Sequence, residues 1–329
     1  MLLTEEEYVK GGYNMEWKTR ITEMFGCKYP ILEGAYAGFG NWEFAAACAN
    51  AGVHGLITAS TARTPEQLRE DIKSCRKATR GSFGVNLSFG ICPRIDEMLE
   101  VCIEERVPVE TAAYKPDSLV PRIKESGLPW IHKTARVKDA LHAEKLGADA
   151  VIVVGLEGVG FKNPDQLPTL INVTWGTPQF KVPFVAAGGI GDARGLLGAL
   201  AMGAEGIMMG TAFMATVECP INRPSKVDLV NSSPDNPRLR WRVLSHASPK
   251  DYAELMRKLG NLPIHEWLPM LERIQPKSSD WEGDPNVPEQ SRVGSLAVGG
   301  IKSVPTVKDF IDNMIREAEE LAKKWQWMK

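Results

Sequence analysis

Several kinds of binding site are missing from this chain of 329 residues. Its six cysteines include no Cys-x-x-Cys pair, so they are typical of buried thiols in a reducing compartment rather than of a zinc site or a disulfide framework. The five histidines have no metal-ligand spacing, and we predict that each is structural and that no metal is bound. A Gly-x-Gly-x-x-Gly fingerprint is also absent, which argues against a dinucleotide site.

Charge and hydropathy argue against two further classes of partner. The formal net charge is only −2, so the chain has no general basic field and is not expected to bind nucleic acid. No apolar run approaches the roughly 18 residues of a membrane span. The first residues, Met1-Leu-Leu-Thr-Glu-Glu-Glu, are too acidic for a signal peptide. We therefore expect a cytoplasmic protein whose partner is a small molecule.

A glycine-rich stretch is the feature around which the rest of the chain is organised. It runs Pro183-Phe-Val-Ala-Ala-Gly-Gly-Ile-Gly-Asp192 and continues to Gly206-Ile-Met-Met-Gly-Thr-Ala-Phe213. Each half begins with a short apolar run that predicts a buried strand, and glycine follows at a turn. The turns expose backbone N–H groups, and Asp192 is suited to cap the next helix. Such turns bind phosphate, although the pattern also fits two tight turns without a ligand.

The order of apolar runs and helical patterns predicts a closed parallel barrel. Strands that alternate with helices argue for a parallel sheet, and eight such units argue for an α/β fold of the (β/α)8 TIM barrel type. In that fold, phosphates usually lie at the turns after strands seven and eight. The expected strands are residues 30–38, 55–58, 82–87, 108–112, 129–134, 149–154, 184–187 and 206–209.

The barrel pattern breaks after the eighth strand. Residues 217–300 are rich in proline, asparagine and serine and contain short helical patterns, so we expect a helical insertion that can cover the barrel as a lid. Residues 306–324 then form an amphipathic pattern typical of a closing helix. We therefore divide the chain into an N-terminal arm, a barrel and a lid. Their bounds are 1–20 for the arm, 21–216 with 301–329 for the barrel, and 217–300 for the lid.

Residues 184–213 closely resemble the nitronate monooxygenase family, formerly called 2-nitropropane dioxygenases. Residues 30–38, Gly84-Val-Asn-Leu87 and Trp130-Ile-His-Lys133 are similar to it too, and the resemblance covers residues 20–218 and returns near 293–320. Members are FMN-dependent barrels that include nitronate oxidisers, NADH:quinone reductases and FMN-dependent enoyl reductases. The resemblance therefore implies that the phosphate belongs to FMN, with NAD(P)H as a candidate co-substrate.

The resemblance also implies which residues hold the cofactor. Backbone N–H groups of the two glycine turns would bind the FMN phosphate, and the turn after the first strand would line the isoalloxazine. Asn86 would hydrogen-bond the ring or its ribityl edge. The implied cofactor-binding residues are Gly34, Ala35, Tyr36, Asn86, Lys133, Gly155, Gly188, Gly189, Gly210 and Thr211.

Lys133 is also a candidate catalytic residue. Side chains alternate along a strand, so Ile131 and Lys133 share one face while Trp130 and His132 share the other. A lysine at the C-terminal end of a barrel strand points towards the site, where its charge would stabilise a reduced flavin. The alternative is a solvated lysine at a strand end, which is an ordinary position for this residue.

The segment after the sixth strand departs from the family pattern. Nitronate-oxidising members have a Glu-x-x-Gly-His segment whose histidine is the base near the flavin, whereas this chain has Gly155-Leu-Glu-Gly-Val-Gly-Phe-Lys-Asn-Pro164. Phe161 stands at the histidine position and cannot accept a proton. The site could transfer hydride without that base, Lys162 could replace it, or the protein could bind FMN and be inactive. Phe161 could also be an ordinary packing residue.

The variant segment, together with Ala113-Tyr-Lys-Pro116, is similar to a subgroup associated with acyl-CoA and steroid-ring catabolism. This similarity implies a CoA thioester as substrate, with Lys162, Arg292 and Lys302 as candidate cations for its phosphates. We therefore predict an FMN-dependent reductase or dehydrogenase that transfers hydride on an enoyl- or ketoacyl-type thioester. The alternatives are nitronate monooxygenase or NAD(P)H:quinone reductase activity, a non-redox barrel for a phosphorylated metabolite, and a flavin-binding protein that acts through partners. A homodimer is a further hypothesis.

Overall fold

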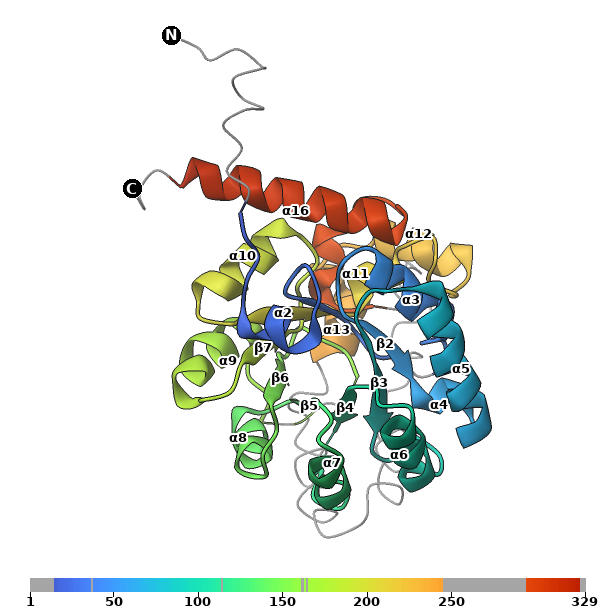
Figure 1. The fold of residues 1–329 in the computed structure, drawn as a ribbon. Helices are drawn as coiled ribbons and strands as arrows, with labels where there is room; N and C mark the ends of the chain where they lie inside the picture. The colour runs from blue at the N-terminus through green and yellow to red at the C-terminus, as the bar shows by residue number, and fades with distance from the viewer. Residues whose placement is uncertain are drawn as a thin grey trace.

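A computed structural model describes residues 15–36, 38–113, 115–160, 163, 165–244 and 294–325. Eight parallel strands form a barrel with helices around it (Figure 1), which confirms the TIM barrel expected from the sequence. The strands are β1 (Ile31–Glu33), β2 (Gly55–Thr58), β3 (Phe83–Ser88), β4 (Val109–Ala112), β5 (Trp130–Thr134), β6 (Ala150–Val154), β7 (Phe184–Ala187) and β8 (Gly206–Met209).

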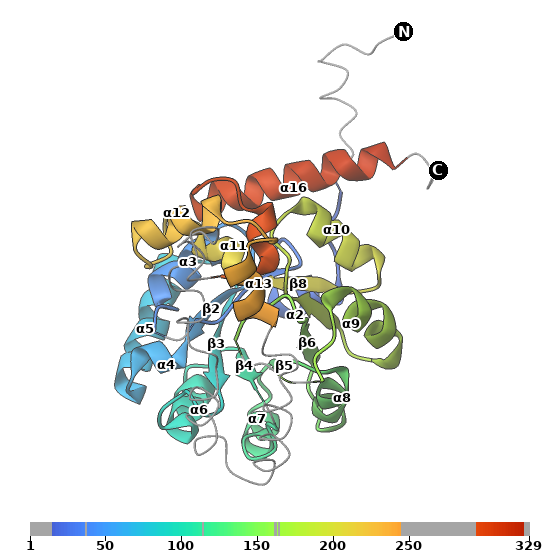
Figure 2. The same ribbon diagram turned by 180° about the vertical axis from the view of Figure 1, so that it is seen from behind.

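The larger helices surround the strands, and α16 contacts both α10 and α3, so it takes the place of the eighth barrel helix (Figure 2). These helices are α3 (Trp42–Asn50), α5 (Pro65–Ala78), α6 (Ile95–Glu104), α7 (Val120–Ser126), α8 (Val137–Lys145), α9 (Thr169–Gly176), α10 (Ala193–Ala201) and α16 (Val307–Lys324). Shorter or additional elements are α2 (Arg20–Phe25), α4 (Ala59–Ala62), η1 (Thr177–Gln179), α11 (Thr211–Met214), α12 (Arg223–Asn231), α13 (Pro237–Leu244) and η4 (Leu296–Gly300).

Part of the predicted insertion is described. It contains α12, α13 and η4, whereas residues 245–293 lie outside the described residues, so the lid itself stays a prediction. Among the helices that are described, none combines the length and the apolar character needed to cross a membrane.

Local sequence sets the starts of two barrel helices as expected. Thr64 Oγ1 accepts the Gln67 N–H at 3.2 Å, and Pro65 is the first residue of α5, where its missing N–H costs no hydrogen bond. Asp192 Oδ1 accepts the Gly195 N–H at 3.0 Å and caps α10. The predicted caps at both helices are therefore confirmed, and the second cap lies directly after the glycine turn that follows β7.

Apolar side chains fill the barrel, and α2 closes its N-terminal end. The interior cluster also contains Ile21 and Phe25 of α2, which therefore continue the core beyond the strands. Burying a large aliphatic side chain contributes about 1.5–3 kcal/mol, so this layer accounts for much of the barrel's stability. Its strand members include Leu32, Leu56, Ile131, Ile152, Val185 and Met208.

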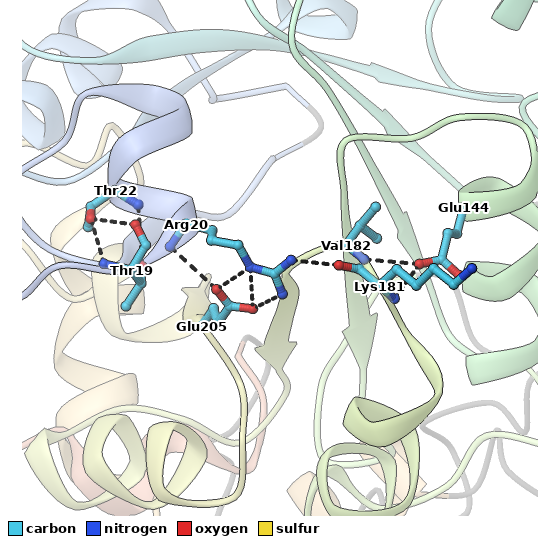
Figure 3. Close-up of polar contacts among 7 residues, drawn as sticks. All are labelled: Thr19, Arg20, Thr22, Glu144, Lys181, Val182 and Glu205. Atoms are coloured by element: carbon cyan, nitrogen blue, oxygen red, sulfur yellow. Dashed lines mark hydrogen bonds and ion pairs between the residues drawn. The ribbon is translucent and has the colours of Figure 1, made fainter.

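Polar contacts tie α2 to the N-terminal ends of the strands (Figure 3). Arg20 pairs with Glu205, just before β8, and its Nη1 donates to the Lys181 carbonyl oxygen at 2.6 Å. Glu144 of α8 accepts the backbone N–H groups of Lys181 and Val182 at 2.7 and 3.0 Å. The network thus joins α2, α8 and the loops before β7 and β8 at the end of the barrel opposite the pocket described below.

The sheet has one weak seam, and Glu33 bridges it. The strand order is β1-β8-β7-β6-β5-β4-β3-β2, and β1 meets β2 only through an isolated bridge between Leu32 and His54. Glu33 Oε2 accepts the Leu56 N–H of β2 at 2.9 Å, so a side chain supplies a bond that the ladder lacks. Burial raises the pKa of Glu33 from 4.5 to about 8, which keeps the carboxyl largely protonated at neutral pH.

Glu33 should therefore make stability fall as pH rises. Between pH 4.5 and 8 the unfolded chain loses the proton that the folded chain keeps. The free energy of unfolding should fall through this window, by up to about 1.4 kcal/mol per pH unit from this group. In Glu33→Gln the side chain cannot ionise, so its stability relative to the wild type should rise from pH 5 to pH 8. Urea unfolding at each pH measures this difference, and parallel pH profiles for the two proteins would contradict it.

Candidate functional site

A pocket opens at the C-terminal ends of the strands and brings most of the predicted site residues together. Nine of the predicted cofactor-binding residues line it: Gly34, Ala35, Tyr36, Asn86, Lys133, Gly188, Gly189, Gly210 and Thr211. Gly155 lies behind this surface, where its N–H donates to the Ala187 carbonyl oxygen at 2.8 Å. The pocket therefore lies at the end of the barrel where TIM-barrel active sites are found.

One end of the pocket is built from the two glycine turns. Gly188 and Gly189 have φ values of 99° and 73°, a left-handed conformation that glycine adopts without strain. The N–H groups of Gly189, Ile190 and Thr211 have no acceptor among the residues that the structure describes. Ile190 and Thr211 are buried, and N–H groups of buried residues normally have a partner, whereas Gly189 is exposed. These donors are therefore available to an anion at the place where the sequence predicts a phosphate.

A pair of residues that the sequence analysis missed holds the first of these turns. Thr169 begins α9, and its N–H donates to Glu157 Oε2 at 2.9 Å. Thr169 Oγ1 lies 2.9 Å from Glu157 Oε2 and 2.8 Å from the Gly188 carbonyl oxygen. A Cβ atom on Gly155 would lie only 1.9 Å from that hydroxyl oxygen, so the glycine is required for this packing. The turn is thus fixed from behind while its N–H groups face the pocket.

The floor of the pocket carries a polar row across three adjacent strands. Lys133 Nζ of β5 lies 2.7 Å from Glu110 Oε1 of β4, and Asn86 Nδ2 of β3 donates to the same oxygen at 2.7 Å. Ser88 Oγ donates to Asn86 Oδ1 at 2.8 Å. Glu110 was not predicted, and its only signal in the sequence is a carboxylate inside a short strand. The row presents N–H donors to the pocket.

Tyr36 forms the wall between the floor and the phosphate end. Its hydroxyl donates to the Gly210 carbonyl oxygen at 3.1 Å, and its ring stacks on Phe39 with a centroid distance of 4.8 Å. Burial, and then the neighbouring Glu33 carboxyl, raise the pKa of Tyr36 well above its ordinary value. The phenol therefore stays protonated at neutral pH and is suited to packing rather than to proton abstraction.

The part of the pocket lining that the structure describes contains no histidine. Its carboxylate, Asp139, is paired with Arg136 at 2.6 Å, and its amine, Lys133, is paired with Glu110. Phe161 and Lys162 lie outside the described residues, but Gly160 and Asn163 on either side of them line the pocket. The described lining thus offers no unpaired group that could act as a base near neutral pH.

The other predicted charges lie elsewhere. Lys302 lines a separate groove between α10 and α16 rather than the pocket, and Arg292 lies outside the described residues. Within the residues that the structure describes, no cluster of histidine, cysteine and carboxylate side chains could hold a metal ion. All six cysteines are buried and unbridged.

The donor set fits a flavin mononucleotide. The two turns offer N–H groups for its phosphate, and Lys133 and Asn86 offer donors for its ring oxygens. Glycine is required where the turns after β1 and β8 meet, since a Cβ on Gly34 would lie 2.9 Å from Gly210 Cα. Ser60 Oγ lines the pocket and has no hydrogen-bond partner among the described residues, so it is a further contact for a bound molecule.

Comparisons with known proteins identify the family of the chain. A family model described as nitronate monooxygenase matches residues 18–92 and 90–317. The chain is 32% identical over 250 residues to the (3aS,4S,5R,7aS)-5-hydroxy-7a-methyl-1-oxo-octahydro-1H-indene-4-carboxyl-CoA dehydrogenase of Mycobacterium tuberculosis, covering 74% of this chain and 69% of that protein. It is 29% identical over 260 residues to a Staphylococcus aureus protein named "Probable nitronate monooxygenase", covering 65% and 73%. FabK from Thermotoga maritima matches with a TM-score of 0.75 and 31% identity, covering 95% and 99%.

The chain belongs to the nitronate monooxygenase family and is an oxidoreductase. Membership implies a flavin cofactor. The family predicted from residues 184–213 is therefore confirmed over nearly the whole chain.

Gly189→Glu should abolish retention of the flavin. The substitution places a carboxylate where backbone N–H groups meet a phosphate, and the new Cβ would lie 2.9 Å from Glu157 Cβ. Flavin absorbance per mole of purified protein measures the loss, and circular dichroism checks the fold. Gly198→Glu on α10 is the matched control, because a Cβ there meets no atom within 4 Å. A folded Gly189→Glu protein that keeps its flavin would show that the phosphate lies elsewhere.

Proposed function

We propose that this member of the nitronate monooxygenase family is an FMN-dependent reductase or dehydrogenase that acts on an acyl-CoA thioester. The observation that carries the proposal is the composition of the pocket. It combines a phosphate cradle and a floor of N–H donors with a described lining that contains no histidine. A bound flavin supplies the ability to accept or donate hydride at a carbon atom of the substrate. Reduction of an enoyl thioester delivers hydride to one carbon and takes up a proton from water at the next, whereas dehydrogenation would also need a group that accepts that proton, for which Lys162 is the candidate from the sequence.

Each pocket residue would contact a different part of the flavin. Gly188, Gly189 and Thr211 would bind the FMN phosphate through their N–H groups. Lys133 would place a positive charge beside the flavin ring, which favours electron-rich forms of the ring, and Asn86 would donate a hydrogen bond to it. Tyr36 would pack against the cofactor and help to exclude water.

Two features support FMN rather than FAD. Thr211 Oγ1 accepts the Ser295 N–H at 3.0 Å, and this bond anchors the segment that leads into η4 beside the phosphate cradle. A Cβ on Gly191 would lie 2.7 Å from the Ala297 carbonyl oxygen, so the segment packs tightly against the turn after β7. A segment packed in this way would obstruct an adenylate that continued from the phosphate in its direction. The fingerprint for a dinucleotide is also missing from the sequence.

The mouth of the pocket supports an acyl substrate. Ile91 and Val159 line it and are 38% and 40% exposed, so their aliphatic side chains are accessible to a bound molecule. They offer an apolar contact for the acyl part of a thioester. The Mycobacterium tuberculosis relative is named for a carboxyl-CoA substrate, which supports the same class here. The CoA phosphates would need cations at the rim, for which Lys162 remains the candidate from the sequence.

An anaerobic titration tests the proposed function. Cofactor released by heat should be FMN by chromatography, and the bound flavin should bleach with an acyl-CoA ester, with NADH or with NADPH. Bleaching by a saturated thioester identifies a dehydrogenase, whereas reoxidation of reduced enzyme by an enoyl thioester identifies a reductase. Release of FAD contradicts the cofactor assignment. A flavin that responds to no thioester in either direction contradicts the substrate class.

Nitronate oxidation is the alternative that the family name and the Staphylococcus aureus relative support. We expect it to be negligible, because general-base catalysis is worth about 10²–10⁴-fold and Phe161 provides no base. Phe161→His should raise nitronate turnover by a factor within that range and should impair the native reaction by adding a polar group to an apolar site. Oxygen consumption with propyl nitronate measures the change, and rapid turnover by the unmodified protein would refute it.

Lys162→Met is the companion variant. Loss of turnover of the thioester with flavin still bound would favour Lys162 as an active-site group. A free lysine has a pKa of about 10.4 and would need burial or nearby positive charge to serve as a base near neutral pH. NAD(P)H:quinone reductase activity is distinguished by quinone-dependent turnover without a thioester. The homodimer and the cytoplasmic compartment stay predictions from the sequence.

A further inference from the structure

Glu110 is a buried carboxylate directly behind the pocket floor. Its side chain is fully buried, and it lies on β4 between the strands that carry Asn86 and Lys133. The strand register pairs Asn86 with Glu110 and Ala112 with Lys133, so the three polar side chains form a diagonal row. Glu110 does not line the pocket, whereas both of its partners do.

The hydrogen bonds of Glu110 leave its two partners with fixed orientations. One oxygen, Oε1, receives both the Lys133 ammonium and the Asn86 amide N–H, each at 2.7 Å. Ser88 Oγ donates to Asn86 Oδ1 at 2.8 Å, which occupies the other side of the amide. Asn86 therefore keeps its second N–H, and one lone pair of Oδ1, for a ligand. Lys133 keeps the rest of its N–H groups while one is held by the carboxylate.

A purely structural reason for this carboxylate is weak. Glu110 Oε2 has no hydrogen-bond partner among the described residues, so half of the buried group is unsatisfied. Buried ion pairs seldom stabilise a fold more than apolar side chains of similar volume would. A carboxylate that is buried with one oxygen unsatisfied points to a role in orienting the groups that it contacts. These groups are Lys133 and Asn86, and both line the pocket.

We propose that Glu110 is a positioning residue that acts on the flavin through Lys133 and Asn86. It holds the two donors against the ring site and offsets the positive charge that Lys133 presents there. The negative charge makes the cofactor harder to reduce than Lys133 alone would make it. This inference rests on the proposed FMN site and adds to it a residue that sets the reduction potential.

Glu110→Gln tests the charge. The substitution keeps the shape of the side chain but leaves the Lys133 charge without its counter-ion. The equilibrium between oxidised and reduced flavin should shift about tenfold towards the reduced form, which is about 30 mV for a two-electron couple. Reduction against a reference dye measures the potential. Glu33→Gln controls for the loss of a buried carboxyl without a change of charge, because Glu33 is equally buried, is largely protonated at neutral pH and neither lines the pocket nor contacts Lys133; the potential of this variant should equal that of the wild type.

A double-mutant cycle tests whether Glu110 acts through Lys133. In a Lys133→Met background the Glu110 carboxylate has no cation to offset. Adding Glu110→Gln should then change the ratio of oxidised to reduced flavin by less than about twofold. An equal shift in both backgrounds overturns the route through Lys133. An unchanged potential in Glu110→Gln with flavin bound overturns the inference as a whole. Glu110→Asp, which keeps the charge, should restore most of the wild-type potential.

A second readout does not depend on the cofactor. In protein stripped of flavin, the Lys133 amine should be acetylated several-fold faster in Glu110→Gln than in the wild type, because the ion pair that holds it is lost. Mass spectrometry of the modified lysine gives the two rates, and equal rates overturn the inference even where a variant loses its flavin. If wild-type protein binds no flavin after reconstitution, the proposed function fails, and the acetylation rates still decide whether Glu110 holds Lys133.

Discussion

The approach of two backbones where β1 meets β8 is the constraint on which the pocket depends. The Gly34 N–H donates to the Met209 carbonyl oxygen at 2.8 Å, and a Cβ on Gly34 would lie 2.9 Å from Gly210 Cα. Any larger residue would separate the turns after these strands, because the obstructing atoms are backbone and cannot rotate away. The same contact places the wall residue Tyr36 against Gly210, so ring site and phosphate cradle are fixed relative to each other.

The buried polar groups at the two ends of the barrel differ in charge. At the N-terminal end, burial lowers the pKa of His54 to about 3, and the ring is neutral, stacked on Phe25 and hydrogen-bonded to Ser82 Oγ at 2.7 Å. At the C-terminal end, Glu110 and Lys133 form an ion pair beside the pocket. A neutral, hydrogen-bonded histidine can be buried in a packed core at little cost in free energy. Burying a charged pair costs more, so we expect such a pair where its groups contact a ligand.

The sequence was sufficient for features that depend on neighbouring residues. Short apolar runs, glycine turns and the capping residues Thr64 and Asp192 predicted the barrel and the glycine turns that line its pocket. Glu110 escaped prediction because its role depends on the register of three strands, which no local pattern encodes. Thr169 escaped prediction for a similar reason, because its hydrogen bond to the Gly188 carbonyl oxygen joins the start of α9 to the turn after β7.

The loop after β6 shows how one cofactor site can serve different reactions. Its first part is fixed, since Glu157 contacts Thr169 through its side chain and accepts the Leu296 N–H at 3.1 Å through its carbonyl oxygen. Its next part, from Gly158 to Gly160, lines the pocket mouth. The anchored residues hold the turn that would bind phosphate, whereas Gly158 to Gly160 line the pocket. Separate residues of one loop thus carry the two tasks, so the lining can change while the contacts that hold the turn are kept.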